Sequence, residues 1–305
     1  MSVSRQQNLP GCVRHPDRPT GLRCVRCDRP ACPDCLREAS VGYQCVDCVR
    51  EGSKTVRPAR TVGGARARNA GPRLVVVPAL ILINVAAFAA TAIQAGSIVD
   101  NSSSALFRDG TLLPAWVSAG EWWRLLTSGF LHFGNYGGYG PVHLLFNMFA
   151  LWVIGKDLEI ALGRVRFLVV YLLSLLGGST AVMLFGAAGG GVAGASGAIY
   201  GLFGGIAVIV FKAKLNPAPV LALLAINIFL SVTLPGISLL GHIGGLVAGA
   251  LSTAALVYAP PARRTQVQVG ACVALLLVMV VTIAVQGAAM DCQVDGSLYY
   301  LCGAG

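Results

Sequence analysis

Seven apolar stretches, separated by short polar segments, dominate the sequence from residue 74 onward. They are residues 74–95, 142–154, 167–187, 195–211, 218–234, 237–259 and 267–287. Several are close to the roughly 20 residues that an α-helix needs to cross a bilayer. The second is short and contains His143 and Asn147, and the fourth and sixth are rich in glycine. The pattern predicts seven membrane-spanning helices.

The composition agrees with this pattern. Of the 305 residues, 55% are hydrophobic and 12% are charged, and the mean hydropathy is +0.69. Soluble domains carry about 25% charged residues, so these values exclude an ordinary soluble protein. The expected fold class is an all-α polytopic membrane protein.

The positive charges indicate the orientation of the predicted helices. Fourteen of the 23 Lys and Arg residues precede residue 74. Only Arg108 and Arg124 lie in loops of the opposite side, whereas seven others occupy every second loop: Lys156, Arg164, Arg166, Lys212, Lys214, Arg263 and Arg264. Because cytoplasmic loops are rich in Lys and Arg, we expect the N-terminus in the cytoplasm and the tail, residues 288–305, outside. The charges would then face anionic lipid headgroups, and a nucleic-acid partner is not needed to explain them.

Residues 1–50 form a second region with a different pattern. They contain four consecutive pairs of metal-binding residue types at two-residue spacing, namely Cys12 and His15, Cys24 and Cys27, Cys32 and Cys35, and Cys45 and Cys48. Eight such ligands suit two tetrahedral Zn²⁺ ions. Disulfides are the alternative, but a cytoplasmic segment keeps its thiols reduced and a histidine forms none. We expect a structural zinc module whose folding depends on the metal.

The spacing resembles B-box-type and other cross-braced zinc fingers. That resemblance implies that alternate pairs share an ion: Cys12, His15, Cys32 and Cys35 at one site, and Cys24, Cys27, Cys45 and Cys48 at the other. Pairing in sequence order is the alternative. Such fingers mostly bind proteins, so a protein partner is favoured over a nucleic acid.

Two further segments flank the predicted helices. Residues 51–73 combine Gly, Pro, Ala and Arg without apolar periodicity, which is typical of a flexible basic linker. Cys292 and Cys302 lie in the tail on the predicted outer side, where a disulfide is stable. Two free thiols are the alternative there.

Polar side chains within the apolar stretches mark a candidate site. His143 and Asn147 are four residues apart and therefore share one helix face, and His242 begins the glycine-rich stretch GHIGGLVAGA. An ionisable residue within a membrane span is costly and usually functional. Hydrogen bonding between helices, worth about 0.6–2 kcal/mol, is the simpler interpretation of each residue taken alone.

The stretch GASGAIYG places Ser196 near the start of the fourth predicted helix. Free N–H groups and the positive end of the helix dipole favour a developing anion there. Gly194 and Gly197 permit a bend and a close neighbour, and glycines recur at four-residue spacing in both this helix and the sixth. A close crossing would bring Ser196 within reach of His242, as a nucleophile and its base. Asn147 and His143 would donate to an oxyanion. Since these stretches carry no carboxylate, the sequence predicts a dyad.

These motifs together resemble the rhomboid family of intramembrane serine proteases. The matching segments are EWWRLLTSGFLHF, HLLFN, GASG and GHIGGLVAG, in this order within residues 74–259. The resemblance implies a six-helix core over 74–259, an attack by Ser196 on a peptide carbonyl of a transmembrane substrate, and proton transfer to His242 without a cofactor. It also implies that the backbone N–H of Ser196 joins Asn147 and His143 in the oxyanion hole, and that the ring of Tyr200 packs on His242.

The zinc module and a seventh helix, residues 260–287, are additions to that core. The alternatives are a catalytically silent rhomboid-like protein, a small transporter, and a zinc module that the helices merely anchor. Retention of Ser196 and His242 argues against the first, and clustering of the polar residues toward one membrane face argues against the second. The abundance of Ala, Gly, Val and Arg is typical of GC-rich bacterial genomes, so the plasma membrane is expected, with an organelle membrane as the alternative.

Overall fold

The computed structural model describes residues 9–55, 61–64, 74–134, 141–234, 236–290, 292–294 and 300–302. The chain divides into two compact units, residues 1–59 and 60–305, which are described separately. Most of the predicted linker 51–73, most of the glycine-rich segment 134–141 and part of the tail 288–305 lie outside the described residues.

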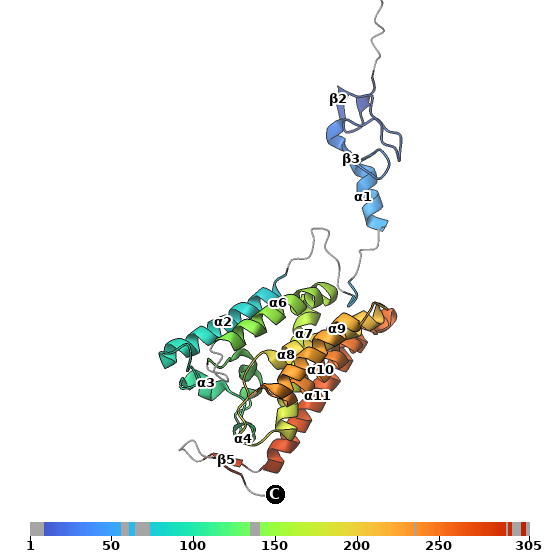
Figure 1. Ribbon diagram of the computed structural model, residues 1–305. Coiled ribbons are helices and arrows are strands. Elements are labelled where there is room, and N and C mark those ends of the chain that lie inside the picture. Colours follow the sequence, from blue (N-terminus) through green and yellow to red (C-terminus); the bar gives the residue numbers. More distant parts are fainter. Residues whose placement is uncertain are drawn as a thin grey trace, which may run out of the picture. The chain divides into compact units, whose positions relative to one another are not determined.

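The N-terminal unit consists of two small antiparallel hairpins and a helix (Figure 1). Strands β1 (Gly11–Cys12) and β2 (His15–Pro19) form one hairpin, and β3 (Leu36–Glu38) and β4 (Tyr43–Cys45) form the other. A 3₁₀ turn, η1 (Pro33–Cys35), precedes β3, and α1 (Val46–Thr55) follows β4. The buried side chains of this unit are mainly cysteines, with Ala31 and Leu36 beside them. So little apolar surface cannot hold a fold of this size without a further constraint.

The second unit is a bundle of helices (Figure 1). Its long helices are α2 (Val76–Ala95), α6 (Val142–Leu162), α7 (Arg164–Phe185), α8 (Ser196–Lys212), α9 (Ala218–Thr233), α10 (Leu239–Val257) and α11 (Arg264–Met290). They coincide with the predicted apolar stretches. Among the described residues, α2, α7, α10 and the segment Pro261–Met290 are long and apolar enough to span a membrane, and α8 and α9 are shorter apolar helices. The chain is a helical polytopic membrane protein with six core helices and a seventh at the C-terminal end.

Helix α6 extends further than the sequence predicted, to Leu162 instead of residue 154. Its last turns are held by burial of Leu158 and Leu162 and by Glu159, which is 3% exposed. The carboxylate of Glu159 accepts hydrogen bonds from the backbone N–H groups of residues 75, 76 and 77 at 2.9–3.1 Å. These N–H groups begin α2 and have no acceptor within that helix. Glu159, whose charge lowers the hydropathy of α6, therefore stabilises the start of α2.

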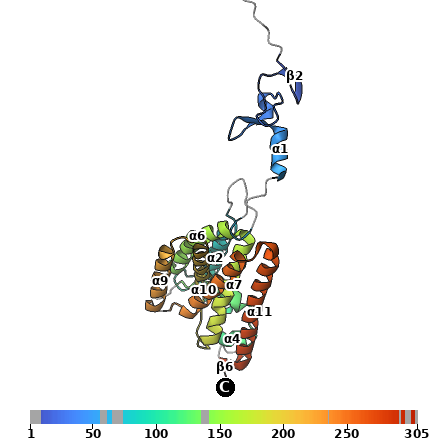
Figure 2. The ribbon, with the colours of Figure 1, turned by 90° about the vertical axis from the view of Figure 1, so that its right-hand side faces the viewer.

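The centre of the bundle is a close crossing of α8 with α10, and α7 packs on both. A Cβ on Gly245 would overlap the carbonyl oxygen of Gly197, and one on Gly249 would overlap that of Gly201. Only glycine allows these backbones to approach so closely. The two glycine stripes thus bring the first turns of α8 and α10 together. Helices α9 and α11 lie on opposite sides of this centre (Figure 2).

The segment between α2 and α6 folds into four short helices: α3 (Ala105–Gly110), α4 (Pro114–Ser118), α5 (Arg124–Thr127) and η2 (Ser128–Phe130). Arg124 is 2% exposed and anchors this segment. Its guanidinium pairs with Glu121 at 2.6 Å and donates to the carbonyl oxygens of Arg108 and Thr111. Since a buried charge is tolerated only when paired, Arg124 serves the fold of this segment and lies outside the candidate site.

Near the C-terminal end, β5 (Cys292–Val294) pairs with β6 (Tyr300–Cys302). Cys292 lies opposite Cys302 in the register of this hairpin, and Cys292 is disulfide-bonded. For Cys292, the disulfide and not the free thiol agrees with the structure.

Candidate active site

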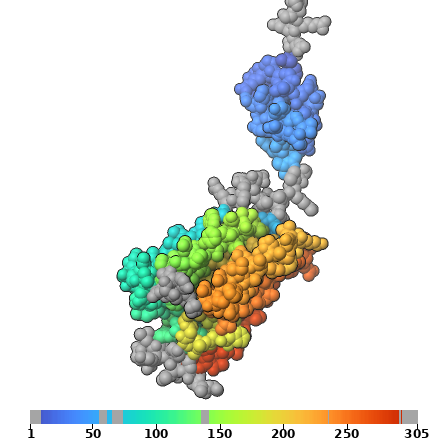
Figure 3. Space-filling model, in the orientation of Figure 1, coloured from blue at the N-terminus to red at the C-terminus, as the bar shows by residue number. Residues whose placement is uncertain are grey.

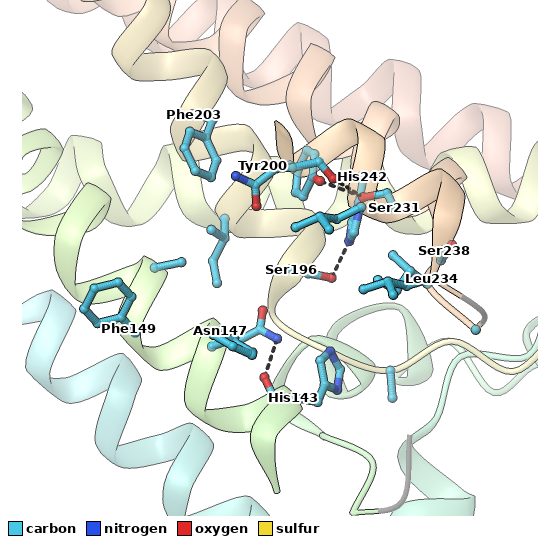
Figure 4. Close-up of a pocket in the computed structure, with 18 of the residues that line it drawn as sticks. His143, Asn147, Phe149, Ser196, Tyr200, Phe203, Ser231, Leu234, Ser238 and His242 are labelled. Carbon is cyan, nitrogen blue, oxygen red and sulfur yellow. Dashed lines mark hydrogen bonds between the residues drawn. The ribbon is translucent and has the colours of Figure 1, made fainter. Parts of the chain in front are cut away.

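Ser196 is the first residue of α8, and His242 lies in the first turn of α10. The Ser196 Oγ atom is 2.8 Å from His242 Nε2, within hydrogen-bond distance (Figure 4). The two residues are 46 positions apart and are brought together by the glycine-mediated crossing. A serine hydroxyl next to an imidazole nitrogen is the arrangement in which the base removes the proton during nucleophilic attack.

Gly194 and its neighbours position Ser196. The φ angle of Gly194 is +139°, which disfavours any residue with a side chain, and a Cβ there would lie 3.0 Å from His143 Cε1. The Gly194 N–H donates to Ser128 O at 2.9 Å, and the Ala195 N–H donates to His132 Nε2 at 3.4 Å. The segment between α2 and α6 therefore fixes the start of α8.

His132 is a residue that the sequence analysis missed. It is fully buried, and its ring lies 5.2 Å from that of His143, measured between centroids. It belongs to the segment EWWRLLTSGFLHF, but it lies outside the apolar stretches that were searched for polar residues. A single histidine in a loop gives no signal of burial, because only tertiary packing removes it from water.

Asn147 and His143 lie on one side of Ser196, and His242 lies on the other (Figure 4). The Asn147 side chain is 7% exposed, and its Nδ2 donates one hydrogen bond to His143 O at 2.9 Å. An amide nitrogen carries two hydrogens, so the second remains for another acceptor. At the N-terminus of α8 the first backbone N–H groups have no acceptor within the helix. Donors from α6 and α8 thus converge on one region beside the Ser196 hydroxyl.

Tyr200, one turn after Ser196, covers one face of the His242 ring. The two rings are stacked with centroids 3.9 Å apart and planes inclined by 13°. Gly197 faces the carbonyl oxygen of Gly241, 3.1 Å from where its Cβ would be. These are the packing positions that the sequence analysis assigned to Tyr200 and Gly197.

Ser231 of α9 completes the surroundings of His242 and was also missed. Its Oγ atom is 2.8 Å from His242 Nδ1 and 2.7 Å from the Tyr200 hydroxyl. The apolar stretches contain no carboxylate that could orient His242. A serine in an apolar helix is too common to suggest such a contact, and Ser231 and His242 lie on different helices, so helical periodicity does not relate them.

The site opens into a cavity of about 650 Å³ lined by α6, α8, α9 and the start of α10. Its walls combine His143, Asn147, Ser196 and His242 with apolar side chains such as Phe146 and Leu230. The space-filling view shows the face of the bundle where green α6 lies near orange α9 (Figure 3). Volume and lining are typical of a binding site with a few polar groups in an apolar wall.

The N-terminal unit holds two candidate metal sites. One group is Cys12, His15, Cys32 and Cys35, the other is Cys24, Cys27, Cys45 and Cys48, and within each group all ligand atoms lie within 4.8 Å of one another. Alternate pairs are therefore brought together, as the cross-braced resemblance implied, and pairing in sequence order is not what the fold produces. None of these seven cysteines is in a disulfide.

Comparison with known proteins relates the helical unit to a protein family. The family model of the rhomboid domain matches residues 119–259, which include all the polar residues of the cavity named above. The rhomboid protease GluP of Bacillus subtilis (strain 168) is 36% identical over 145 residues, covering 46% of this chain and 27% of GluP. The rhomboid protease AarA of Providencia stuartii is 28% identical over 220 residues, covering 61% of this chain and 73% of AarA.

A second Bacillus subtilis (strain 168) relative, YdcA, is 35% identical over 140 residues, which is 44% of this chain and 67% of YdcA. The chain spans only about a quarter of the length of GluP, so similarity to that protein concerns one part of it. The ordered motifs, the helical bundle and these matches lead to one assignment: this chain belongs to the rhomboid family.

Proposed function

We propose that the chain is an intramembrane serine endopeptidase that cleaves transmembrane segments of other membrane proteins. The observation that carries the proposal is the 2.8 Å contact between Ser196 Oγ and His242 Nε2 in a cavity that His143 and Asn147 also line. Membership in the rhomboid family and similarity to the proteases GluP and AarA support it.

In the proposed reaction, Ser196 Oγ attacks the carbonyl carbon of the scissile peptide bond while its proton passes to His242 Nε2. The tetrahedral intermediate carries a negative oxygen, which the Ser196 N–H, the second Asn147 amide hydrogen and His143 stabilise. The C–N bond then breaks, and His242 gives the proton to the leaving amine. Water, activated by His242, attacks the acyl carbon and releases Ser196 with the second product. The reaction needs no cofactor.

The cavity indicates the substrate class. The cavity is bounded by α6 and α9 and has a mainly apolar wall, which suits a transmembrane segment that enters from the lipid bilayer. A helical segment must unwind before its carbonyl reaches Ser196, because helix hydrogen bonds occupy its backbone. Small or helix-breaking residues near the cleaved bond should therefore favour cleavage.

We infer that the N-terminal unit binds two structural zinc ions. A tetrahedral site with Zn–S bonds of about 2.3 Å and Zn–N bonds of about 2.0–2.1 Å places its ligand atoms about 3.5–3.8 Å apart. The Sγ atoms of Cys27 and Cys45 are 3.8 Å apart, and His15 Nδ1 lies 3.4 Å from the Sγ atoms of both Cys32 and Cys35. The residues fit zinc, and with four protein ligands each site has no place for a catalytic water. A protein partner is the proposed ligand of this unit.

Orientation and location are also proposals. The concentration of Lys and Arg before residue 74 favours an N-terminal unit in the cytoplasm and a C-terminal hairpin outside. The disulfide at Cys292 agrees with an oxidising outer side. A bacterial plasma membrane is the proposed site of action.

Cleavage of a reporter with one transmembrane helix, by the purified full chain in detergent, tests the proposal. Wild-type protein should cleave it, and Ser196→Ala and His242→Ala should each abolish cleavage. Ser252→Ala is the matched control, because Ser252 is buried in α10 and its side chain bonds, among the described residues, to Gly249 O alone. Equal cleavage by Ser196→Ala and wild type would refute the assignment.

A further inference from the structure

Helix α9 contacts the rest of the bundle through few residues. Of its sixteen residues only Ser231 is buried, with 5% of its surface exposed. Its neighbours Val232 and Thr233 are exposed. The burial of Ser231 thus does not reflect a general packing interface, since no other residue of α9 is buried. It reflects the contacts of one side chain with the candidate active site (Figure 4).

Ser231 Oγ has three polar neighbours within hydrogen-bond distance. They are His242 Nδ1 at 2.8 Å, the Tyr200 hydroxyl at 2.7 Å and the carbonyl oxygen of Asn227 at 2.8 Å. The carbonyl can only accept, and serine in a helix commonly donates its hydroxyl proton to the carbonyl four residues earlier. With the Ser231 proton on Asn227 O, the two lone pairs of Oγ accept from the Tyr200 O–H and the His242 Nδ1–H. This arrangement satisfies every donor and acceptor of the four groups.

This arrangement of protons goes with one tautomer of His242. A neutral imidazole carries one proton, and the hydrogen bond of one nitrogen decides which nitrogen has it. With the proton on Nδ1, the Nε2 atom is an acceptor and faces Ser196 Oγ at 2.8 Å. That is the tautomer a general base needs. The opposite tautomer would have Nε2 donate to Ser196 and could not remove its proton.

The contact also selects one orientation of the ring. Stacking on Tyr200 holds the plane of the His242 ring but leaves two orientations that differ by a 180° flip. Only one of them gives Nδ1 a partner at Ser231 and directs Nε2 to Ser196. Ser231 therefore selects between the two flipped orientations of the ring, whereas stacking on Tyr200 holds only the plane of the ring.

We propose that Ser231 is a positioning residue for His242, occupying with a hydroxyl the place that a carboxylate fills in a Ser-His-Asp triad. It acts through His242 and does not touch the substrate carbonyl. The inference rests on the proposed function, because it assigns Ser231 a part in the reaction of Ser196.

A simpler interpretation is that Ser231 only satisfies its own helix. Serine and threonine in apolar helices commonly donate to the carbonyl four residues earlier. Thr233 does so: its Oγ1 bonds to Phe229 O at 2.9 Å, and among the described residues it makes no hydrogen bond to His242. Ser231 and Thr233 both donate to the carbonyl four residues earlier. Of these two, Ser231 also contacts the His242 imidazole and the Tyr200 phenol. Thr233 is therefore a matched control on the same helix.

The test compares full-length wild type, Ser231→Ala, Ser231→Thr and Thr233→Ala in detergent. The first readout is kcat and KM for the transmembrane reporter, and the second is the rate at which a fluorophosphonate probe labels Ser196. Loss of an acceptor for a group that becomes charged during the reaction should lower both kcat and the labelling rate of Ser231→Ala about 10- to 100-fold. KM should change less than about twofold, since the interaction strengthens only in the transition state. Ser231→Thr, which keeps the hydroxyl, and Thr233→Ala should stay near wild type.

Unchanged kcat and labelling in folded Ser231→Ala would overturn the proposal and leave Ser231 a structural residue. If Ser231→Ala does not fold, Ser231→Cys keeps the volume but accepts hydrogen bonds weakly, and the same two outcomes apply to its labelling rate. Wild type that is labelled at Ser196 but cleaves no reporter would contradict the proposed peptidase, while the labelling rates still decide on Ser231. Wild type that shows neither labelling nor cleavage would overturn both.

Discussion

The close crossing of α8 and α10 predicts the effect of adding one methyl group. Gly245 lies three residues after His242, and its Cα faces Gly197, the residue after Ser196. In Gly245→Ala the new Cβ would lie 2.7 Å from the carbonyl carbon of Gly197. Non-bonded carbon atoms sit about 3.5–4.0 Å apart, and the overlap with the Gly197 carbonyl oxygen is tighter, so the helices must separate locally by at least about 1 Å. Added to the 2.8 Å between Ser196 and His242, this shift would break their hydrogen bond.

The expected result is a large loss of turnover with a smaller loss of stability. A displacement of about 1 Å at reacting groups costs up to about 100-fold in rate. Overpacking typically destabilises by about 1–3 kcal/mol, and the better helix propensity of alanine offsets about 1 kcal/mol of it. The protein should therefore stay folded at the assay temperature.

Reporter kcat and fluorophosphonate labelling, measured below the melting temperature of each variant, test this reasoning. Gly270→Ala on α11 is the matched control, because a Cβ at Gly270 meets no atom within 4 Å. It should keep wild-type turnover. Wild-type kcat in a folded Gly245→Ala variant would refute the view that the glycine stripes set the geometry of the site.

Three other predictions concern separate parts of the chain. His143→Ala should lower kcat by about 10²–10³-fold with little change in melting temperature if His143 stabilises the oxyanion; an equal loss of stability with normal kcat would make it a packing residue. The purified chain should contain two zinc ions by elemental analysis, and Cys24→Ser should lose one of them without changing reporter kcat; a metal-free, folded N-terminal unit would contradict this. Glu159→Gln should lower stability by about 1–3 kcal/mol, since a carboxamide offers one acceptor oxygen to three N–H groups of α2, and a denaturation curve matching wild type would show that the cap is dispensable.

The helices of the bundle and the pairing of Ser196 with His242 could be predicted from the sequence. Apolar stretches and their breaks follow from the cost of exposing polar backbone to lipid, so the ends of the long helices other than α6 were found within a few residues. The glycine spacing pointed to the crossing that joins Ser196 to His242, since small residues at four-residue spacing lie on one helix face. The spacing of the cysteine pairs likewise indicated two ligand groups.

Other features depend on contacts that leave no periodic trace. Lys156, Asp157 and Glu159 shortened the predicted second helix because hydropathy counts each charge as polar, although Glu159 meets N–H groups of α2 in the fold. Ser231 approaches His242 from a third helix, and His132 approaches Ala195 from a loop. Single side chains of common types carry no information about such partners until the packing of the helices is known.

Covalent labelling of Ser196 tests the central claim most directly. Wild type, Ser196→Ala and His242→Ala would be treated with a fluorophosphonate, digested and analysed by mass spectrometry for the modified residue. The proposed dyad predicts modification at Ser196 in wild type and almost none in His242→Ala, in which the hydroxyl remains but its base is gone. Modification of Ser196 at the same rate in His242→Ala, or modification of another serine only, would contradict it.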